Sequence, residues 1–282
     1  FNDINYYKNH MIKQAIIPLA GLGTRLLPLT SVMPKELLPI NGKPNLEYIM
    51  DECIEAGIKE FIFIISKNKI SIKKYFFNDA FYKNIIKKKK DKRIIKEFEK
   101  IKKYQKMIKF VYQNKPKGTG DAVLKCKKHI KNKFFLMLLP DDLIIKKNCS
   151  KEMINLHKKT KGSIIATKKV NKKTVSRWGI LSFKEKKRNF FIIKDVIEKP
   201  STRQAPSNYA IIGRYILPSK IFVEIKNLKP GKGGEIHITD AIKNLISKGE
   251  NFFGNIFMGK YLDCGTINGY IQSGLKIFKG QK

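Results

Sequence analysis

The chain has 282 residues, which is long enough for one large α/β domain with a substantial core. Its formal net charge of +36, taken alone, favours a nucleic-acid partner, but only six of its 59 basic residues are arginine, the residue best suited to reading base edges. The lysines are spread along nearly the whole chain, so we interpret the charge as compositional bias on a solvated surface and expect neither nucleic acid nor membrane as a partner.

Apolar runs alternate with helix-like segments in the first half of the chain. The pattern predicts strands at Gln14–Leu19, Glu60–Ile65, Met107–Tyr112 and Phe134–Leu139, and helices at Pro44–Ala56, Lys69–Phe76 and Gly120–Ile130. The lysine-rich segment Asn78–Lys106 is interpreted as a surface helical insertion. Repeated strand–helix–strand units predict a mostly parallel sheet with helices on both faces and with ligands outside the carboxyl ends of its strands.

Strands become more frequent in the second half. The pattern predicts strands at Ile164–Thr167, Ile180–Phe183, Phe190–Ile197 and Tyr209–Leu217, and helices at Lys220–Lys226, Thr239–Ser247 and Ile267–Phe278. No repeat or low-complexity linker separates the halves, so we expect one continuous unit. The predicted fold is α/β, with a Rossmann-like, mostly parallel mixed sheet flanked by helices and a smaller β-rich portion.

The cysteines and the apolar runs indicate the cellular compartment of the protein. The four cysteines are scattered and form no Cys-x-x-Cys pair, so neither a zinc site nor a disulfide framework is indicated. The apolar runs at 16–20 and 134–140 are too short for a signal core or a spanning helix. We expect a reduced, cytoplasmic location.

The loop after the first predicted strand carries the strongest functional signal. Gly21 and Gly23 are followed by Thr24 and Arg25, and a second cation, Lys35, comes ten residues later. Glycines let backbone N–H groups approach anionic oxygens, and the two cations supply the charge that a phosphoryl transition state needs. The loop matches neither the dinucleotide fingerprint nor the Walker A pattern, yet it predicts a triphosphate site.

Two carboxylates are candidates for binding magnesium. Asp141 follows the strand predicted at 134–139, and Asp263 also follows an apolar run. Mg²⁺ usually takes only one or two carboxylates from the protein and completes its shell with phosphate and water. An alternative for the pair Asp141-Asp142 is a turn or a helix cap before Leu143.

Taken together, these segments resemble the sugar-phosphate nucleotidyltransferases, and most of all the bacterial UTP–glucose-1-phosphate uridylyltransferases. The resemblance extends over nearly the full chain. Its segments are Ala20–Arg25, Pro34–Pro39, Gln113 with Lys117–Ala122, Leu139–Asp141, Trp178–Ile180, Glu198–Pro200, Pro206–Ser207–Asn208, Ile212–Tyr215, Thr239–Ala241 and Asp263–Gly265. Each segment is unspecific alone, but their order and spacing make accidental similarity improbable.

The resemblance implies roles for residues at the nucleotide. Arg25 and Lys35 would hold the triphosphate beside the glycine loop of Gly23 and Thr24, and Mg²⁺ would be held by Asp141 and Asp263. Base recognition would use main-chain atoms near Ala20 and Gly21, the amide of Gln113, and Gly118 against the ring.

The resemblance also implies roles at the sugar phosphate. Glu198 would bind glucose hydroxyls, Lys199 would bind the sugar phosphate, and Gly179 would let the backbone approach the ring. Trp178 stands where relatives more often carry Tyr, which changes the rim of the site. Three further residues are expected to contact substrate, namely Glu36, Asp142 and Gly213.

The implied reaction is attack by a phosphate oxygen of glucose 1-phosphate on the α-phosphorus of UTP, which gives UDP-glucose and pyrophosphate. Residues 12–142 would bind the nucleotide and residues 143–282 the sugar phosphate, within a single domain, and we expect a homo-oligomer, either a dimer or a tetramer. Relatives that use dTTP typically read Gly-Gly-x-Gly-Thr-Arg and Lys-Gln-Leu-Leu-Pro, whereas this chain has Ala20-Gly21 and Lys35-Glu36, which favours UTP.

Three alternatives stay open. One is the same chemistry with dTTP or another sugar 1-phosphate, and another is a catalytically silent family member that serves as a regulatory or binding subunit. The third is a basic nucleic-acid-binding protein.

Overall fold

The first half of the chain forms the alternating strands and helices that its apolar pattern predicts. The computed structural model describes residues 11–77, 85, 86, 88 and 90–280. Its elements in this half are β1 (Gln14–Pro18), β2 (Pro39–Ile40), β3 (Lys43–Pro44), α2 (Asn45–Glu55), β4 (Glu60–Ile65), α3 (Ile70–Phe77), α5 (Lys92–Gln105), β5 (Ile108–Tyr112), α6 (Thr119–Leu124) and β6 (Phe134–Leu138). The helix α5 confirms the helical insertion, whose residues 78–84, 87 and 89 lie outside the described residues.

The helix α6 is shorter than the sequence predicts. It ends at Leu124 and is followed by a single 3₁₀ turn, Lys127–His129. The side chain of Gln14 then binds the chain on both sides of Ile130, accepting from the Lys131 amide at 2.7 Å and donating to the His129 carbonyl at 2.8 Å. This contact with β1 holds the segment extended, so the helix cannot continue through it.

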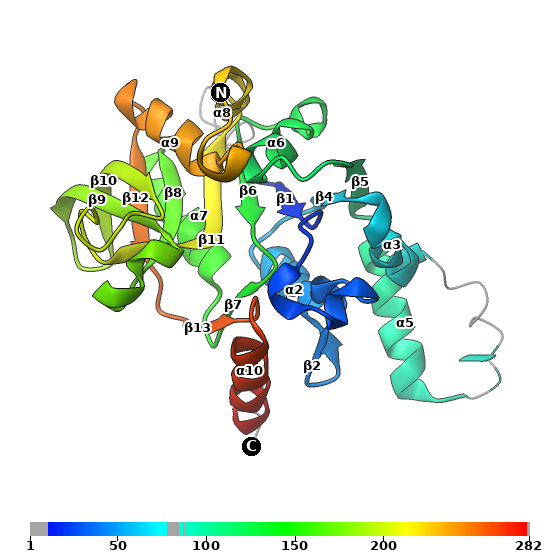
Figure 1. Cartoon of the computed structure of the whole chain (residues 1–282). Helices are drawn as coiled ribbons and strands as arrows, with labels where there is room; N and C mark the ends of the chain where they lie inside the picture. Colours follow the sequence, from blue (N-terminus) through cyan, green and yellow to red (C-terminus); the bar gives the residue numbers. More distant parts are fainter. Residues whose placement is uncertain (1–10, 78–84, 87, 89, 281–282) are drawn as a thin grey trace.

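Nine strands of the described chain form one mixed sheet. Five of them come from the second half of the chain, namely β8 (Ser163–Lys169), β9 (Gly179–Lys186), β10 (Phe190–Glu198), β11 (Tyr209–Pro218) and β12 (Phe252–Ile256). The strand order is β5-β4-β1-β6-β11-β8-β12-β10-β9. The strands from β5 to β6 are parallel, and helices connect them (Figure 1). From β11 onward the pairs are antiparallel, except for β8 with β12. The prediction of a mostly parallel sheet is therefore correct only for the first half. In the second half β9 and β10 form a hairpin, which requires antiparallel pairing, and β11 runs antiparallel to both β6 and β8.

The second half extends the same sheet. Its elements are β7 (Asp142–Ile145), α7 (Cys149–Thr160), β8 (Ser163–Lys169), β9 (Gly179–Lys186), β10 (Phe190–Glu198), β11 (Tyr209–Pro218), α8 (Ile221–Asn227), α9 (Ile238–Ser247), β12 (Phe252–Ile256), β13 (Lys260–Asp263) and α10 (Ile267–Lys279). The strand β11 lies against β6 and joins the two halves.

Four of these elements were not predicted, namely β7, α7, β12 and β13. Both β7 and β13 have only four residues, and they pair with each other outside the main sheet. The strand β12 contains Gly254, where a Cβ would lie 2.4 Å from the ring of Phe191. Glycine weakens the strand signal in the sequence, but here it makes room for an aromatic side chain of β10.

Apolar side chains cover both faces of the sheet. In β1, Ala15 and Ile17 pack on one face with residues of α2 and α7, while Ile16 packs on the other with residues of α6, α8 and α9. Alternating strand residues point to opposite faces, so burial on both sides fixes β1 at the centre of the molecule. Polar and glycine-rich residues that follow β1 and β6 therefore emerge together at one edge of the sheet.

No helix in the described part of the chain has the length and apolar character that a membrane crossing requires. The helix α10 projects from the body of the molecule, close to the β2–β3 hairpin (Figure 1).

Candidate active site

The glycine loop after β1 is shaped by one left-handed residue. Gly23 has φ +72° and begins the 3₁₀ turn Thr24–Leu26. Its carbonyl accepts from the Leu26 amide at 2.9 Å and from the hydroxyl of Thr30 at 2.8 Å. A Cβ at Gly23 would lie 3.2 Å from Thr30, so both the backbone angle and the space favour glycine. Ala20 is buried just before the loop, whereas Gly21 is exposed with open space around it.

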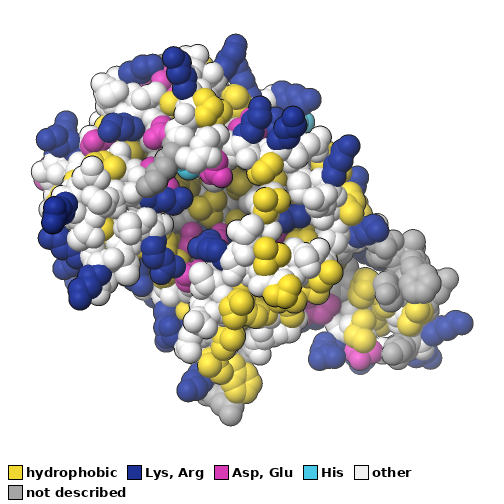
Figure 2. All heavy atoms as spheres, viewed as in Figure 1, with side chains coloured by type: hydrophobic (Ala, Val, Ile, Leu, Met, Phe, Trp, Pro, Cys, Tyr) yellow, Lys and Arg dark blue, Asp and Glu magenta, His cyan; other side chains and the backbone are white. Residues whose placement is uncertain are grey.

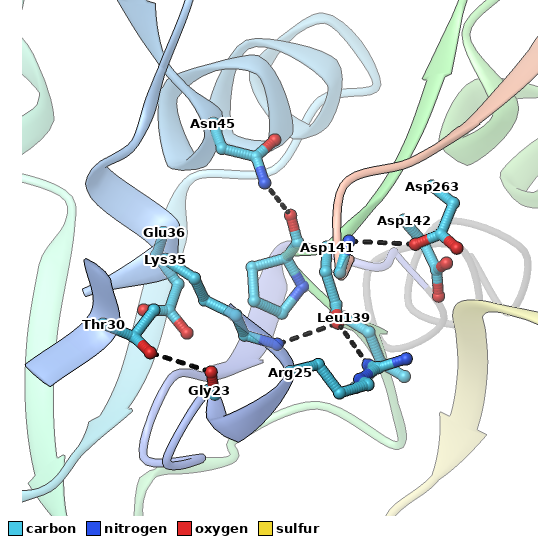
Figure 3. A network of polar contacts seen from close by, with 12 residues as sticks. Gly23, Arg25, Thr30, Lys35, Glu36, Asn45, Leu139, Asp141, Asp142 and Asp263 are labelled. Atoms are coloured by element: carbon cyan, nitrogen blue, oxygen red, sulfur yellow. Dashed lines mark hydrogen bonds and ion pairs between the residues drawn. The ribbon is translucent and has the colours of Figure 1, made fainter. Parts of the chain in front are cut away.

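Two cations from this loop meet the first carboxylate. Lys35 and Arg25 approach the same oxygen of Asp141, at 2.8 Å and 3.3 Å (Figure 3). Burial opposes the charged form of Asp141, but the two cations outweigh it and lower the pKa of the carboxyl. Burial likewise opposes the charge on Lys35, yet Asp141 and Glu36 raise its pKa. The cluster therefore holds its charges at neutral pH.

Two hydrogen bonds to backbone carbonyls hold the loop that contains Asp141. Asn45, at the start of α2, donates to the carbonyl of Pro140 at 2.8 Å (Figure 3). The amide of Cys264 donates to the carbonyl of Asp141 at 2.8 Å. The loop after β6 is thus tied both to the first half of the chain and to the segment after β13.

The pairing of β7 with β13 brings two more carboxylates to this place. Asp142 and Asp263 are direct partners in that ladder, and the hydroxyl of Tyr261 donates to Asp142 at 2.6 Å. Burial, together with the charge of Asp141, raises the pKa of Asp142 to about 7. At Gly213 a Cβ would lie 2.4 Å from Asp142, so glycine there leaves room for this carboxylate.

Gly265 lies between the two predicted magnesium ligands. An ideal Cβ on Gly265 would be 2.7 Å from an Asp141 oxygen and 3.3 Å from an Asp263 oxygen, so these oxygens are no more than about 6 Å apart. Asp263 also accepts from the Gly265 amide at 2.9 Å. Within the described residues, no group of three or more His, Cys, Asp and Glu side chains could hold a metal. Two converging carboxylates fit Mg²⁺, which takes few protein ligands when phosphate is present.

The predicted sugar-phosphate residues lie at the end of β10. Glu198 pairs with Gly179 of β9 in the sheet and accepts from the hydroxyl of Thr239 at 3.0 Å. Lys199 follows in a left-handed conformation, with φ +44°, and its Nζ lies 3.7 Å from a Glu198 oxygen. A Cβ at Gly179 would lie 3.3 Å from Glu198, so glycine keeps this carboxylate accessible.

Trp178 and Arg177 connect the two groups of residues. The Lys199 amide donates to the Trp178 carbonyl at 3.0 Å, and Arg177 is 3.2 Å from Asp263. The guanidinium of Arg177 stacks over the Trp178 ring, 5.6 Å from its centroid, and Tyr261 meets the same ring edge-on. Sequence reasoning missed Arg177, although it directly precedes the Trp178–Ile180 motif. Figure 2 shows a hollow between the two halves, where basic and acidic side chains meet.

The predicted base-binding residues lie beyond the end of β5. The amide of Gln113 donates to Asp121 at 2.6 Å and to the carbonyl of Gly118 at 3.3 Å. Gly118 has φ +94°, and a Cβ there would lie 2.6 Å from the carbonyl of Ile236, so only glycine fits this close approach. Sequence reasoning did not single out Asp121, although it lies inside the quoted motif.

Glu36, which we expect to contact substrate, has a buried side chain that is bound to Lys69. It is 1% exposed, and both of its oxygens accept from Lys69 at 2.8 Å. Burial, which outweighs the nearby carboxylates, lowers the pKa of Lys69. The pair fastens the 3₁₀ turn Lys35–Leu37 to the segment after β4, and so it positions Lys35.

A second buried ion pair supports the Asp141 loop. Its Arg214 lies in the quoted segment Ile212–Tyr215, but sequence reasoning assigned no role to Arg214 or to its partner Glu52. Arg214 is fully buried and donates to both oxygens of Glu52 at 2.8–3.2 Å. It also donates to the carbonyls of Leu139 and Gly213, at 3.2 Å and 3.1 Å. Ser150 donates to the same Glu52 carboxylate from its amide and its hydroxyl. Arg214 thus joins α2, β11 and α7 to the end of β6.

Comparison with known proteins decides the family. The family model described as nucleotidyl transferase matches residues 14–280. The chain belongs to this family. A UTP–glucose-1-phosphate uridylyltransferase of Mycoplasma pneumoniae is 37% identical over 94% of this chain and 91% of its own, and one of Bacillus subtilis is 36% identical over 94% and 90%.

Solved structures of family members have the same fold as this nucleotidyltransferase chain. An apo UDP-glucose pyrophosphorylase is 36% identical, with a TM-score of 0.88 over 96% of this chain and 100% of its own. A UTP-bound UGPase from Acinetobacter baumannii is 31% identical, with a TM-score of 0.85 over 95% and 93%. These matches cover both halves of the sheet.

Proposed function

We propose that this chain transfers the uridylyl group of UTP to α-D-glucose 1-phosphate and releases UDP-glucose and pyrophosphate. The observation that carries the proposal is the meeting of two cations and two carboxylates near the end of β6. Arg25 and Lys35 contact Asp141, and Asp141 and Asp263 approach each other on either side of Gly265. The names of relatives that match over more than 90% of both chains supply the two substrates.

The nucleophile in this reaction is already an anion, a phosphate oxygen of the sugar phosphate. No general base is needed, and catalysis becomes a matter of alignment and charge neutralisation. Arg25 has a side chain that is 60% exposed, so it can reach a triphosphate at the mouth of the loop. Lys35 is more buried and is held by its neighbours, which suits a fixed contact with the phosphate undergoing attack.

The residues present fit a magnesium ion, with Asp141 and Asp263 as its protein ligands. Bound there with the substrates' phosphates, Mg²⁺ would neutralise charge on the phosphates that react. Arg177, which contacts Asp263, and Lys35, which contacts Asp141, keep the two carboxylates oriented toward this position.

The sugar phosphate fits the end of β10. Lys199 is half-exposed and offers a cation for the attacking phosphate, while Glu198, oriented by Thr239, offers acceptors for glucose hydroxyls. Gly179 leaves space beside Glu198 for the ring. We therefore propose that residues 143–282 bind the sugar phosphate and that residues 12–142 bind the nucleotide, with Gln113 and Gly118 at the base.

The test is pyrophosphate release from each nucleoside triphosphate in turn, with Mg²⁺ and glucose 1-phosphate. Release with UTP, and much less with dTTP, is expected. Asp141→Asn keeps the shape of the side chain but removes a charge that Lys35 and Arg25 require, so it should lower turnover by at least about a hundredfold. Release with dTTP alone would favour the alternative substrate, and no release with any triphosphate would favour a silent homologue.

A further inference from the structure

The side-chain amide of Gln113 is held in one orientation. Its nitrogen donates to a carboxylate oxygen of Asp121 at 2.6 Å and to the carbonyl of Gly118 at 3.3 Å. Both partners only accept hydrogen bonds, so a flipped amide would place its oxygen against two acceptors. The assignment of nitrogen and oxygen in Gln113 is therefore fixed by chemistry.

This orientation uses both amide hydrogens and leaves the oxygen available. Among the described residues, none donates to Oε1 of Gln113. Asp121 is only 14% exposed, and it is the third residue of α6. Lys125, one turn later, lies 3.8 Å from it and offers a positive charge.

We infer that Asp121 determines the choice of base by making Gln113 an acceptor alone. The inference rests on the proposed function, in which Gln113 faces the base. An acceptor in this place pairs with the N3–H of uracil. Cytosine presents an unprotonated N3 at the same position, so two acceptors would face each other and neither would receive a hydrogen bond. Asp121 acts through Gln113 and is a positioning residue, not a catalytic one.

The variant Asp121→Asn tests this role with almost no change in shape. An asparagine either accepts from or donates to the Gln113 amide, so the amide becomes free to turn its nitrogen toward the base. We expect kcat/KM for UTP to fall and that for CTP to rise, so that their ratio decreases by at least about tenfold. The control Lys125→Met removes the exposed partner of Asp121 and keeps the carboxylate, and it should leave the ratio near that of the unmodified chain.

The measurement is pyrophosphate release with UTP and with CTP, for the unmodified chain and both variants. A merely structural role for Asp121 would lower both activities together and leave their ratio unchanged, and that result would overturn the inference. If the unmodified chain uses neither nucleotide, the proposed function itself fails, and the inference fails with it. If it uses UTP and Asp121→Asn keeps the ratio, only the inference fails.

Discussion

Replacing Glu52 by Gln should destabilise the fold by about 3–5 kcal/mol, because it leaves the guanidinium of Arg214 buried without its counter-charge. Arg214 is 0% exposed, and three of its five hydrogen bonds to the described residues end on the two Glu52 oxygens. Glutamine keeps the volume and one acceptor but turns a donor toward the guanidinium. A domain of this size is stable by only about 5–15 kcal/mol, so the variant should lose a large share of its stability.

The assay is urea unfolding followed by the fluorescence of Trp178, the single tryptophan of the chain, with the free energy of unfolding taken by linear extrapolation. The matched control is Glu185→Gln, which breaks an ion pair with Lys187 at 3.7 Å. Both side chains of this pair are more than half exposed, so the change should lower the free energy of unfolding by less than about 1 kcal/mol. Combining Glu52→Gln with Arg214→Met should cost less than the sum of the two single changes. Equal losses in the Glu52 and Glu185 variants would refute the reasoning.

Two further predictions concern catalysis. Gly265→Ala places a Cβ 2.7 Å from Asp141 and should lower kcat by about ten- to a hundredfold. The control Gly274→Ala lies in α10, where a Cβ meets nothing within 4 Å, and should leave kcat unchanged. Steady-state rates measure the effect on kcat and thermal melts the effect on stability, and full activity of Gly265→Ala would contradict the site. Lys199→Met should raise the KM for glucose 1-phosphate and lower kcat. The control Lys187→Met breaks an ion pair of the same 3.7 Å length and should change neither constant. Unaltered KM and kcat in Lys199→Met would show that this residue does not belong to the site.

Local patterns were sufficient for the central sheet and the glycine loop. The strands β1, β4 and β6 are short apolar runs between polar turns, and their burial on both faces leaves a signal that one sequence carries. The edge strand β5 is only partly buried, with Lys109 and Tyr112 exposed, but its apolar residues still predict a strand. The loop that follows β1 was predicted from Gly21, Gly23 and Arg25, because a phosphate site requires particular residue types close together in the chain.

The side chains of Lys35 and Glu36 have different environments, which the local sequence does not predict. They are neighbours in one 3₁₀ turn, in which successive residues point about 120° apart. Lys35 reaches Asp141, while Glu36 is buried against Lys69. Their order in the sequence does not say which of them faces the site, because that depends on which residue the segment between β4 and α3 places behind the turn.

The sequence by itself determined the alternation of strands and helices, the glycine loop with its two cations, and the family resemblance. Only the tertiary structure decided how the carboxylates meet, because β7 and β13 are too short to leave a periodic signal and pair residues as far apart as Asp142 and Asp263, which are separated by 121 positions. It also decided that Arg214 lies beneath the Asp141 loop and that Asp121 holds Gln113. Such contacts arise from packing between distant segments, and no local pattern in a single chain specifies them.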